Sequence, residues 1–308
     1  MKVIAIVGPT AVGKTALAIE LARELDGEII SCDSMQIYKE MNIGTAKPTK
    51  EELCAVKHHL IDIKEPYEEF SCADYAVLAK EAIDDIISRG KTPIFCGGTG
   101  LYLDSVLEIE SFSSGVKDQE YRGGLELLAR EQGAEVLHKM LCEVDPKSAE
   151  AIHMNNVKRV IRALEIFKCT GITKSEWDER SKSDKKPYDS TVFFLTCRDR
   201  EILYSRIEKR VDIMLEMGLE SEARGLYDKG YLREGLTAGG AIGYKEFTPY
   251  FKGEATFEEC VERLKISTRQ YAKRQLTWFT KKGYNTVYVD EQLPREEVLR
   301  VLANERGN

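Results

Sequence analysis

The most constraining feature of this chain is a glycine-bounded loop near its start. Residues 8–15 read Gly-Pro-Thr-Ala-Val-Gly-Lys-Thr, after the apolar run Val3–Val7 and before a stretch of helical periodicity at 14–25. Two glycines with four residues between them, then Lys and a hydroxyl residue, form a phosphate-binding loop when a strand precedes them and a helix follows. The backbone N–H groups of such a loop surround an anion at the positive end of the helix. The sequence therefore predicts a parallel sheet that binds a di- or triphosphate.

Each residue of this loop has an expected role. Lys14 would neutralise the terminal phosphate oxygens, and the Thr15 hydroxyl would help to hold Mg²⁺ on them. The predicted diphosphate contacts are Gly8, Thr10, Ala11, Val12, Gly13, Lys14 and Thr15, with Thr15 as the metal ligand. A purely structural glycine turn is the alternative. The loop leaves the chemistry open, because kinases, ATP-hydrolysing enzymes and other diphosphate-handling enzymes share it.

Alternating strand and helix patterns predict the fold class. The expected strands are residues 3–7, 28–31, 60–63, 93–96, 192–197 and 286–289, and the expected helices include 14–25, 71–88, 199–217 and 257–281. Continuous apolar strands that alternate with helices are typical of a parallel sheet covered on both faces. We predict an α/β fold of the P-loop NTPase type.

Residues 111–189 interrupt this alternation. They contain no convincing strand, and helical patterns occur at 121–131, 134–141 and 157–167 before a polar run at 182–186. We interpret the segment as an inserted helical domain. The expected division is a core of residues 1–110 and 190–308 and an insertion of residues 111–189.

Composition excludes several classes of protein. The longest early apolar run has five residues, too short for a signal peptide or a membrane span, so we expect a cytoplasmic protein without membrane contact. None of the eight cysteines forms a Cys-x-x-Cys pair, which disfavours a structural zinc site, and the thiols are expected to stay reduced. The net charge of −7 is unusual for a nucleic-acid binder.

One segment reverses this acidic balance. No Asp or Glu lies between Glu262 and Asp290. Its cations are Arg263, Lys265, Arg269, Lys273, Arg274, Lys281 and Lys282. This local positive charge is compatible with an RNA contact.

Two further loops follow predicted strands. Asp33 and Ser34 come directly after the second strand, and a Gly-Gly-Thr-Gly sequence at 97–100 follows the fourth. The carboxyl ends of parallel strands share one edge, where ligands bind. Asp33 is either a general base or metal-linked carboxylate, or a turn or helix cap. Thr99 is likewise a candidate helix cap.

These loops and several other motifs closely resemble the tRNA dimethylallyltransferases, also called tRNA isopentenyltransferases, of bacterial type. The matching segments are 31–38 (Ser-Cys-Asp-Ser-Met-Gln-Ile-Tyr), 42–48 (Asn-Ile-Gly-Thr-Ala-Lys-Pro), 58–62 (His-His-Leu-Ile-Asp), 97–102 (Gly-Gly-Thr-Gly-Leu-Tyr), 159–165 (Arg-Val-Ile-Arg-Ala-Leu-Glu), 242–246 (Ile-Gly-Tyr-Lys-Glu) and 269–279 (Arg-Gln-Tyr-Ala-Lys-Arg-Gln-Leu-Thr-Trp-Phe). They occur in order over most of the chain. The set is specific, although no single segment would suffice.

The resemblance implies a reaction. Dimethylallyl diphosphate would alkylate N6 of the adenosine 3′ of the anticodon in tRNA, with release of pyrophosphate and with Mg²⁺ as cofactor. It also implies that Asp33 is the base and that Thr99 and Arg210 reach the diphosphate. The implied contacts to the tRNA anticodon stem-loop are Asp33, Ser34, Met35, Gln36, Lys158, Arg159, Arg162, Gly243, Tyr244, Lys245, Lys273, Arg274, Gln275 and Trp278. A monomer is expected.

Several alternatives stay open at this stage. Arg210 could form a surface ion pair, Trp278 could be a packing residue, and the cations at 158–162 could be a solvated helix face. Gly239 and Gly240 stand where relatives commonly carry a longer polar side chain, which leaves the RNA contact of that loop in doubt. The rival functions are an adenylate isopentenyltransferase, a P-loop small-molecule kinase and a non-catalytic, nucleotide-dependent RNA-binding protein.

Overall fold

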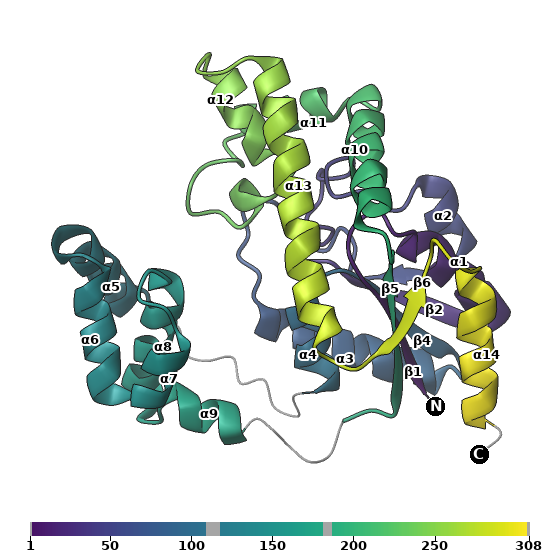
Figure 1. Cartoon of the computed structure of the whole chain (residues 1–308), viewed down its shortest axis with the longest axis horizontal. Coiled ribbons are helices and arrows are strands. Elements are labelled where there is room, and N and C mark those ends of the chain that lie inside the picture. Colours follow the sequence, from purple (N-terminus) through teal and green to yellow (C-terminus); the bar gives the residue numbers. More distant parts are fainter. Residues whose placement is uncertain (1, 109–117, 181–186, 307–308) are drawn as a thin grey trace. The chain divides into compact units, whose positions relative to one another are not determined.

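The computed structural model describes residues 2–108, 118–180 and 187–306 (Figure 1). It contains two compact units. The first joins Met1–Leu107 with Tyr188–Asn308, and the second is Glu108–Pro187. The borders at Leu107 and Tyr188 lie within three residues of those expected from the sequence. In the described parts of the chain, no helix is both long and apolar enough to span a membrane.

The first unit is built on a parallel sheet of six strands in the order β3-β2-β4-β1-β5-β6. The strands are β1 Val3–Val7, β2 Gly27–Cys32, β3 His58–His59, β4 Thr92–Gly97, β5 Ser190–Thr196 and β6 Asn285–Tyr288. Every residue of β1 is buried, as expected for a strand with neighbours on both sides and helices on both faces. The predicted α/β class and parallel sheet are confirmed.

Helices of the first unit connect and cover these strands. They are α1 Lys14–Glu24, α2 Lys50–Ala55, α3 Cys72–Ser88, α4 Gly100–Leu107, α10 Arg200–Glu216, α11 Leu219–Asp228, α12 Thr248–Phe251, α13 Phe257–Thr280 and α14 Pro294–Arg306, with 3-10 turns η1 Ala238–Gly240 and η2 Lys245–Phe247. Ser71 and Thr256 form capping boxes that start α3 and α13. These local signals explain why both helices begin where the sequence predicts.

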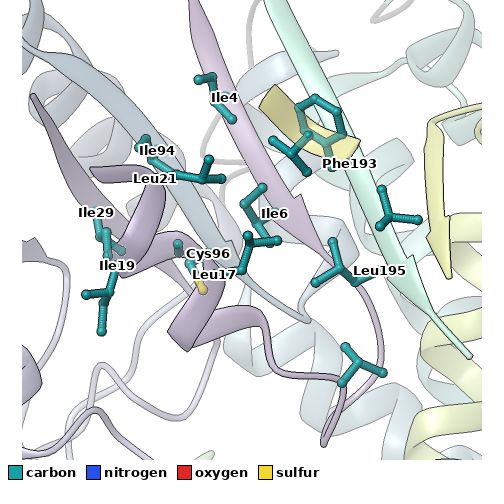
Figure 2. Packing of buried hydrophobic residues seen from close by; sticks show 14 of the residues in the cluster. Ile4, Ile6, Leu17, Ile19, Leu21, Ile29, Ile94, Cys96, Phe193 and Leu195 are labelled. Carbon is teal, nitrogen blue, oxygen red and sulfur yellow. The ribbon is translucent and has the colours of Figure 1, made fainter. Parts of the chain in front are cut away.

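The two faces of the sheet bury different side chains. Ile4, Ile6 and Ile94 point toward Leu17 and Leu21 of α1 in one continuous apolar cluster (Figure 2). Helix α14 packs against β5, β6 and α1, while α3 and α4 pack against β2, and α3 also against β4. The chain reverses direction along the sheet between β3 and β4, so a right-handed crossover places α3 on the face opposite α1.

One predicted strand is wrong in position. The third strand was expected at 60–63, but the structure has a two-residue strand, His58–His59. Leu60 and Asp62 adopt positive φ angles of 62° and 56°, which end the extended conformation. β1 has its predicted bounds, and the other four strands differ from theirs by one or two residues.

The second unit is helical. Its helices are α5 Gln119–Gln132, α6 Ala134–Val144, α7 Pro146–Ala151, α8 Val157–Thr170 and α9 Lys174–Arg180. Leu125, Leu137, Leu141, Val160 and Leu164 form its apolar core. Residues 118–180 contain no strand. The polar run predicted at 182–186 lies outside the described residues.

Candidate active site

Three loops meet at the carboxyl edge of the sheet because their strands are neighbours. The order β2-β4-β1 places the Gly97–Gly100 loop between the Asp33 loop and the phosphate loop. The carboxyl edge of a parallel sheet is where α/β proteins bind ligands.

The phosphate loop has the backbone geometry of an anion cradle. Ala11 and Gly13 have φ angles of 68° and 88°, and Gly13 precedes α1 without a side-chain cap. The first N–H groups of α1 are therefore free to bind an anion. Gly8 packs so closely on β5 that a Cβ atom would lie 2.2 Å from the carbonyl oxygen of Leu195. Only glycine fits there.

The Lys14 ammonium has no carboxylate of the described residues within 4.0 Å. Its Nζ donates a hydrogen bond to the carbonyl oxygen of Pro9 at 2.7 Å. Burial, together with the positive charge of Arg210, lowers the pKa of Lys14 to about 8, against the opposing effects of Cys96 and Asp33. A bound anion would supply the missing charge.

Asp33 interacts with both cations of this site. Burial raises the pKa of Asp33, while the N–H of Met35 and the charges of Lys14 and Arg210 oppose that rise. Its Oδ1 accepts the N–H of Met35 at 2.9 Å, which forms an Asx-type turn. Asp33 is thus a turn residue and also lies within electrostatic range of Lys14 and Arg210, so the two sequence interpretations are compatible.

Thr99 is held against the Asp33 loop. Its N–H donates to the carbonyl of Cys32 at 3.0 Å, and its Oγ1 accepts the N–H of Ser34 at 3.1 Å. Its carbonyl oxygen accepts the N–H of Tyr102 and so starts α4. The hydroxyl therefore bonds the neighbouring loop, whereas the alternative was a side-chain cap. Tyr271 of α13, absent from the predicted site, also lies close to Thr99.

Arg210 extends from α10 toward the same place. Burial lowers the pKa of its guanidinium, while the negative charges of Asp33 and Glu52 oppose the shift. Among the described residues it has no ion-pair partner within 4.0 Å and is half-buried. Arg210 therefore does not form the surface ion pair that was the alternative. The acids near it on α10, Glu208 and Asp212, pair with Arg269 and Lys265 of α13 instead.

Gln275 connects two of the three loops. Its Oε1 accepts the N–H of Thr10 at 3.0 Å, and its Nε2 donates to the carbonyl of Gly98 at 3.0 Å. The side chain is buried, with 5% of its surface exposed. Two predicted contacts change as a result: the Gln275 amide bonds protein instead of RNA, and Thr10 offers a diphosphate its hydroxyl but no free N–H.

Trp278 lies one turn further along α13. It packs so closely on Gly100 that a Cβ there would lie 2.3 Å from its Cδ1. The residue is half-buried, and its Nε1 is buried without a hydrogen-bond partner in the described structure. Most of the Trp278 side chain therefore packs within the protein, as the alternative to an RNA contact predicted.

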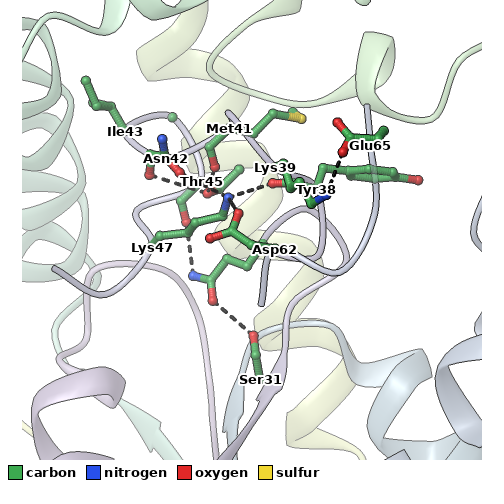
Figure 3. A network of polar contacts seen from close by, with 12 residues as sticks. Ser31, Tyr38, Lys39, Met41, Asn42, Ile43, Thr45, Lys47, Asp62 and Glu65 are labelled. Atoms are coloured by element: carbon green, nitrogen blue, oxygen red, sulfur yellow. Dashed lines mark hydrogen bonds and ion pairs between the residues drawn. The ribbon is translucent and has the colours of Figure 1, made fainter. Parts of the chain in front are cut away.

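A buried lysine organises the segment that follows Asp33. The Lys47 ammonium donates to the carbonyl of Tyr38 at 2.6 Å and to Asn42 Oδ1 at 3.1 Å, and it pairs with Asp62 (Figure 3). The Gln36 amide is also engaged, with Ser31 and with the carbonyls of Thr45 and Ala46. Gln36 was predicted to contact RNA, but in the structure its amide holds this segment in place.

The predicted RNA loop around Tyr244 is largely internal. Tyr244 is fully buried, and Gly243 is buried with its N–H bonded to Glu246. Of the three residues predicted there, only Lys245 is exposed. A side-chain contact between Tyr244 and RNA is incompatible with this packing.

The neighbouring glycines account for the unusual sequence before this loop. A Cβ at Gly239 would lie 2.4 Å from the carbonyl oxygen of Arg233, while Gly240 has open space around it. A longer side chain is therefore excluded at position 239 and sterically allowed at 240. Gly239 and Lys245 line a cavity of about 620 Å³, and none of its lining residues belongs to the three loops.

The cationic segment of α13 divides into two groups. Lys265 and Arg269 pair with Asp212 and Glu208 of α10, and Lys282 pairs with Asp104. Lys273 and Arg274 are exposed and have no ion-pair partner among the described residues. The charge free to contact RNA is therefore concentrated near the end of α13 that carries Gln275.

A second cationic group lies on α8 of the helical unit. Lys158 and Arg159 are exposed, whereas Arg162 pairs with the buried carboxylate of Glu165 at 2.6 Å. Arg122 pairs with the same carboxylate at 2.7 Å. Arg162 thus has a structural role in this unit, and Lys158 and Arg159 stay available to a partner.

The donor set near Thr15 bears on the expected Mg²⁺. In the described parts of the chain, no group of three His, Cys, Asp or Glu residues could hold a metal by itself. Thr15 follows Lys14 at the start of α1, close to Cys96 of β4. A single hydroxyl fits Mg²⁺, because that ion is usually bound by substrate phosphates and water with few protein ligands.

Comparison with known proteins identifies relatives of this chain. Residues 36–282 match the IPP transferase family model. The tRNA dimethylallyltransferase of Geobacillus thermodenitrificans is 53% identical over 90% of this chain and 87% of its own length. That of Bacillus cereus strain AH187 is 53% identical over 98% of this chain and 94% of its own length.

Solved structures give the same result. The tRNA isopentenylpyrophosphate transferase of Bacillus halodurans superposes with a TM-score of 0.72 at 45% identity, over 98% of this chain and 96% of that one. A eukaryotic dimethylallyltransferase acting on tRNA superposes with a TM-score of 0.80 at 34% identity, over 94% and 74%. The chain belongs to the IPP transferase family, which includes these tRNA dimethylallyltransferases.

Proposed function

We propose that this enzyme transfers a dimethylallyl group from dimethylallyl diphosphate to N6 of the adenosine 3′ of the anticodon in tRNA, releasing pyrophosphate. The single observation that carries the proposal is that the Asp33 loop, the Thr99 loop and the phosphate loop meet at one edge of the sheet, where the charges of Asp33, Lys14 and Arg210 lie within electrostatic range of one another. A carboxylate next to an anion cradle suits a reaction that takes a proton from a nucleophile while an anion leaves.

The leaving group would be received by the phosphate loop. Pyrophosphate gains negative charge as the allylic C–O bond breaks, so donors fixed in advance stabilise the transition state. Lys14 and the free N–H groups at the start of α1 are such donors. Thr99 and Arg210 would contact the same diphosphate, and Mg²⁺ held through Thr15 would neutralise part of its charge.

The nucleophile would lose its proton to Asp33. An exocyclic amine is a weak nucleophile, and its proton becomes acidic only as the C–N bond forms. A carboxylate within hydrogen-bond reach then contributes roughly 10²–10⁴-fold. The charges of Lys14 and Arg210 favour the ionised form of Asp33 that this role requires.

Binding of tRNA would use the exposed cations Lys158, Arg159, Lys245, Lys273 and Arg274. Single-stranded RNA loops are bound through phosphates and unstacked bases, and a base must leave its stack before it can react. We expect one chain to act alone in the cytoplasm, since every proposed catalytic group comes from a single chain.

The test is a comparison of acceptors and donors. Purified protein is incubated with Mg²⁺ and labelled dimethylallyl diphosphate in the presence of either bulk tRNA or AMP, and the nucleosides are analysed. Label in an adenosine of the tRNA anticodon loop is the expected result. Label in AMP alone would identify an adenylate isopentenyltransferase, and ATP consumption without prenyl transfer would identify a kinase.

A further inference from the structure

The side-chain amide of Gln275 bonds both edges of the proposed catalytic centre. Its acceptor oxygen holds the N–H of Thr10 in the phosphate loop, and its donor nitrogen holds the carbonyl of Gly98, next to Thr99. The two backbone partners are 265 and 177 residues away in sequence. Both bonds are 3.0 Å long, which is ordinary for N–H···O geometry.

Packing around Gly98 leaves the amide a single position. A Cβ at Gly98 would lie 2.0 Å from Gln275 Nε2 and 3.3 Å from the carbonyl oxygen of Gly8. The Gly98 carbonyl is therefore reached only because this residue has no side chain. With 5% of its surface exposed, the Gln275 side chain leaves little access to water as a substitute partner.

We infer that Gln275 is a positioning residue that fixes the phosphate loop relative to Thr99, so that the diphosphate meets its cradle and the Thr99 hydroxyl together. This inference rests on the proposed function and assigns Gln275 to the diphosphate side of the reaction. Glutamine suits the position because one partner needs an acceptor and the other a donor. Glutamate lacks the donor when ionised, and methionine lacks both groups.

The same helix presents Lys273 and Arg274 to solvent. Substitutions of Gln275 and of the exposed cations on α13 should therefore affect different ligands. Loss of the Gln275 amide should weaken diphosphate binding and leave tRNA affinity unchanged. Loss of the exposed Lys273 charge should weaken tRNA binding and leave diphosphate affinity unchanged.

The variants for the test are Gln275→Met, Gln275→Glu and Gly98→Ala, with Thr277→Ala as the matched control. Thr277 is exposed on α13, and its hydroxyl bonds the carbonyl of Lys273 in its own helix. Gln275→Glu keeps the size and the acceptor for Thr10, so it tests the Gly98 bond, while Gln275→Met tests both bonds without a buried charge. Gly98→Ala displaces the amide from the opposite side.

Four measurements are made on the full-length protein. They are KM for dimethylallyl diphosphate and kcat, the Kd of pyrophosphate with Mg²⁺, the Kd of tRNA, and hydrogen exchange of the backbone at residues 8–14. We expect each Gln275 variant and Gly98→Ala to lower kcat/KM for the diphosphate about 10- to 100-fold. Pyrophosphate binding should weaken and exchange at Thr10 should accelerate, while tRNA affinity stays that of the wild type and of Thr277→Ala.

Two results would overturn the inference. One is a Gln275→Glu or Gln275→Met enzyme with unchanged pyrophosphate affinity and unchanged exchange at Thr10. The other is a selective loss of tRNA affinity, which would return Gln275 to the RNA contacts. Failure of the proposed function is distinguishable, because the wild type would then transfer no prenyl group while pyrophosphate binding and exchange still report on the bridge.

Discussion

The hydroxyl of Tyr244 donates a hydrogen bond to Glu222 Oε1 at 2.7 Å, and the same carboxylate accepts the backbone N–H groups of Asn42, Ile43 and Gly44. Gly44 allows this arrangement, since a Cβ there would lie 2.5 Å from the Tyr244 ring. The pair thereby anchors the segment that continues from the Asp33 loop onto α11.

Glu222→Ala should therefore destabilise the protein. It leaves three backbone N–H groups and the Tyr244 hydroxyl without their acceptor, and we expect a loss of about 2 kcal/mol in the free energy of unfolding. Urea denaturation measures it. Glu220→Ala on the same helix removes only a surface pair with Arg224 and should cost under about 1 kcal/mol. Equal effects of the two substitutions would contradict the anchoring role.

Asp33→Asn should nearly abolish prenyl transfer, by roughly 10²–10⁴-fold, because the amide cannot take the proton. Asparagine keeps an oxygen for the Met35 N–H, so the turn should persist. The variant should still bind pyrophosphate. The activity of the wild type should fall as the pH is lowered, with a midpoint above the usual pKa of Asp, because burial raises the pKa of Asp33. Full activity of the variant in a single-turnover assay would exclude Asp33 as the base.

Pyrophosphate affinity should depend on the charge of Lys14. Its pKa in the free protein is about 8, so the ammonium loses its proton as pH rises past that value and the cradle loses a charge. Calorimetric titration at pH 7 and pH 9 should show a larger relative loss for the wild type than for Lys14→Arg, which stays charged. Because both proteins bind the same pyrophosphate, the effect of pyrophosphate ionisation on affinity is common to both and cancels in the comparison. Parallel pH curves would refute the prediction.

The buried carboxylate of Glu28 should make folding sensitive to acid. Arg89 and His59 bind it, and the hydrogen bonds from Arg89 are the main cause that lowers the pKa of Glu28 to about 2. A depressed carboxyl pKa stabilises the fold above the unfolded value of about 4.5, and this contribution disappears as pH falls from there toward 2. Its size is about 3 kcal/mol.

Urea unfolding of Glu28→Gln against the wild type checks this. The difference in unfolding free energy should be largest at pH 7 and shrink toward pH 3, whereas Glu20→Gln on the exposed face of α1 should show no such trend. A difference independent of pH would show that Glu28 acts through packing alone.

The cations of α8 should contribute unequally to tRNA binding. Lys158→Gln removes an exposed charge, so the slope of log affinity against log salt should fall by about 0.7–0.9 with stability unchanged. Arg162→Gln should instead destabilise the helical unit, because Glu165 is buried and would keep only Arg122 and the N–H of Asp118 among its described partners. Filter binding over a salt series, with Lys147→Gln as control, measures the slopes. An unchanged slope for Lys158→Gln would exclude that contact.

Local sequence signals predicted the frame of the molecule and the three loops. The phosphate loop, the Asp33 turn and the Thr99 loop each depend on a few adjacent residues, so strand, turn and helix patterns were sufficient to locate them. The third strand was misplaced because Leu60 and Asp62 adopt positive φ angles that their apolar context did not indicate.

The partners of individual side chains could not be predicted in this way. Tyr244, Gln36 and Gln275 belong to motifs that suggested RNA contacts, yet each is hydrogen-bonded to other groups of the protein. Lys47 and Tyr271 were also within these motifs, which was the available signal for them, whereas Glu222 stands outside every motif. The apparently unpaired cations Lys265 and Arg269 find their acids on α10.

The sequence by itself determined where the anion cradle, its flanking strand and helix, and the neighbouring polar loops lie along the chain. Only the tertiary structure decided that α13 holds the cradle through Gln275 and that α11 holds the segment after Asp33 through Glu222. The physical reason is range. Backbone conformation and periodicity are set within a few residues, whereas a buried amide or carboxylate finds its partner only when packing brings together segments far apart in sequence.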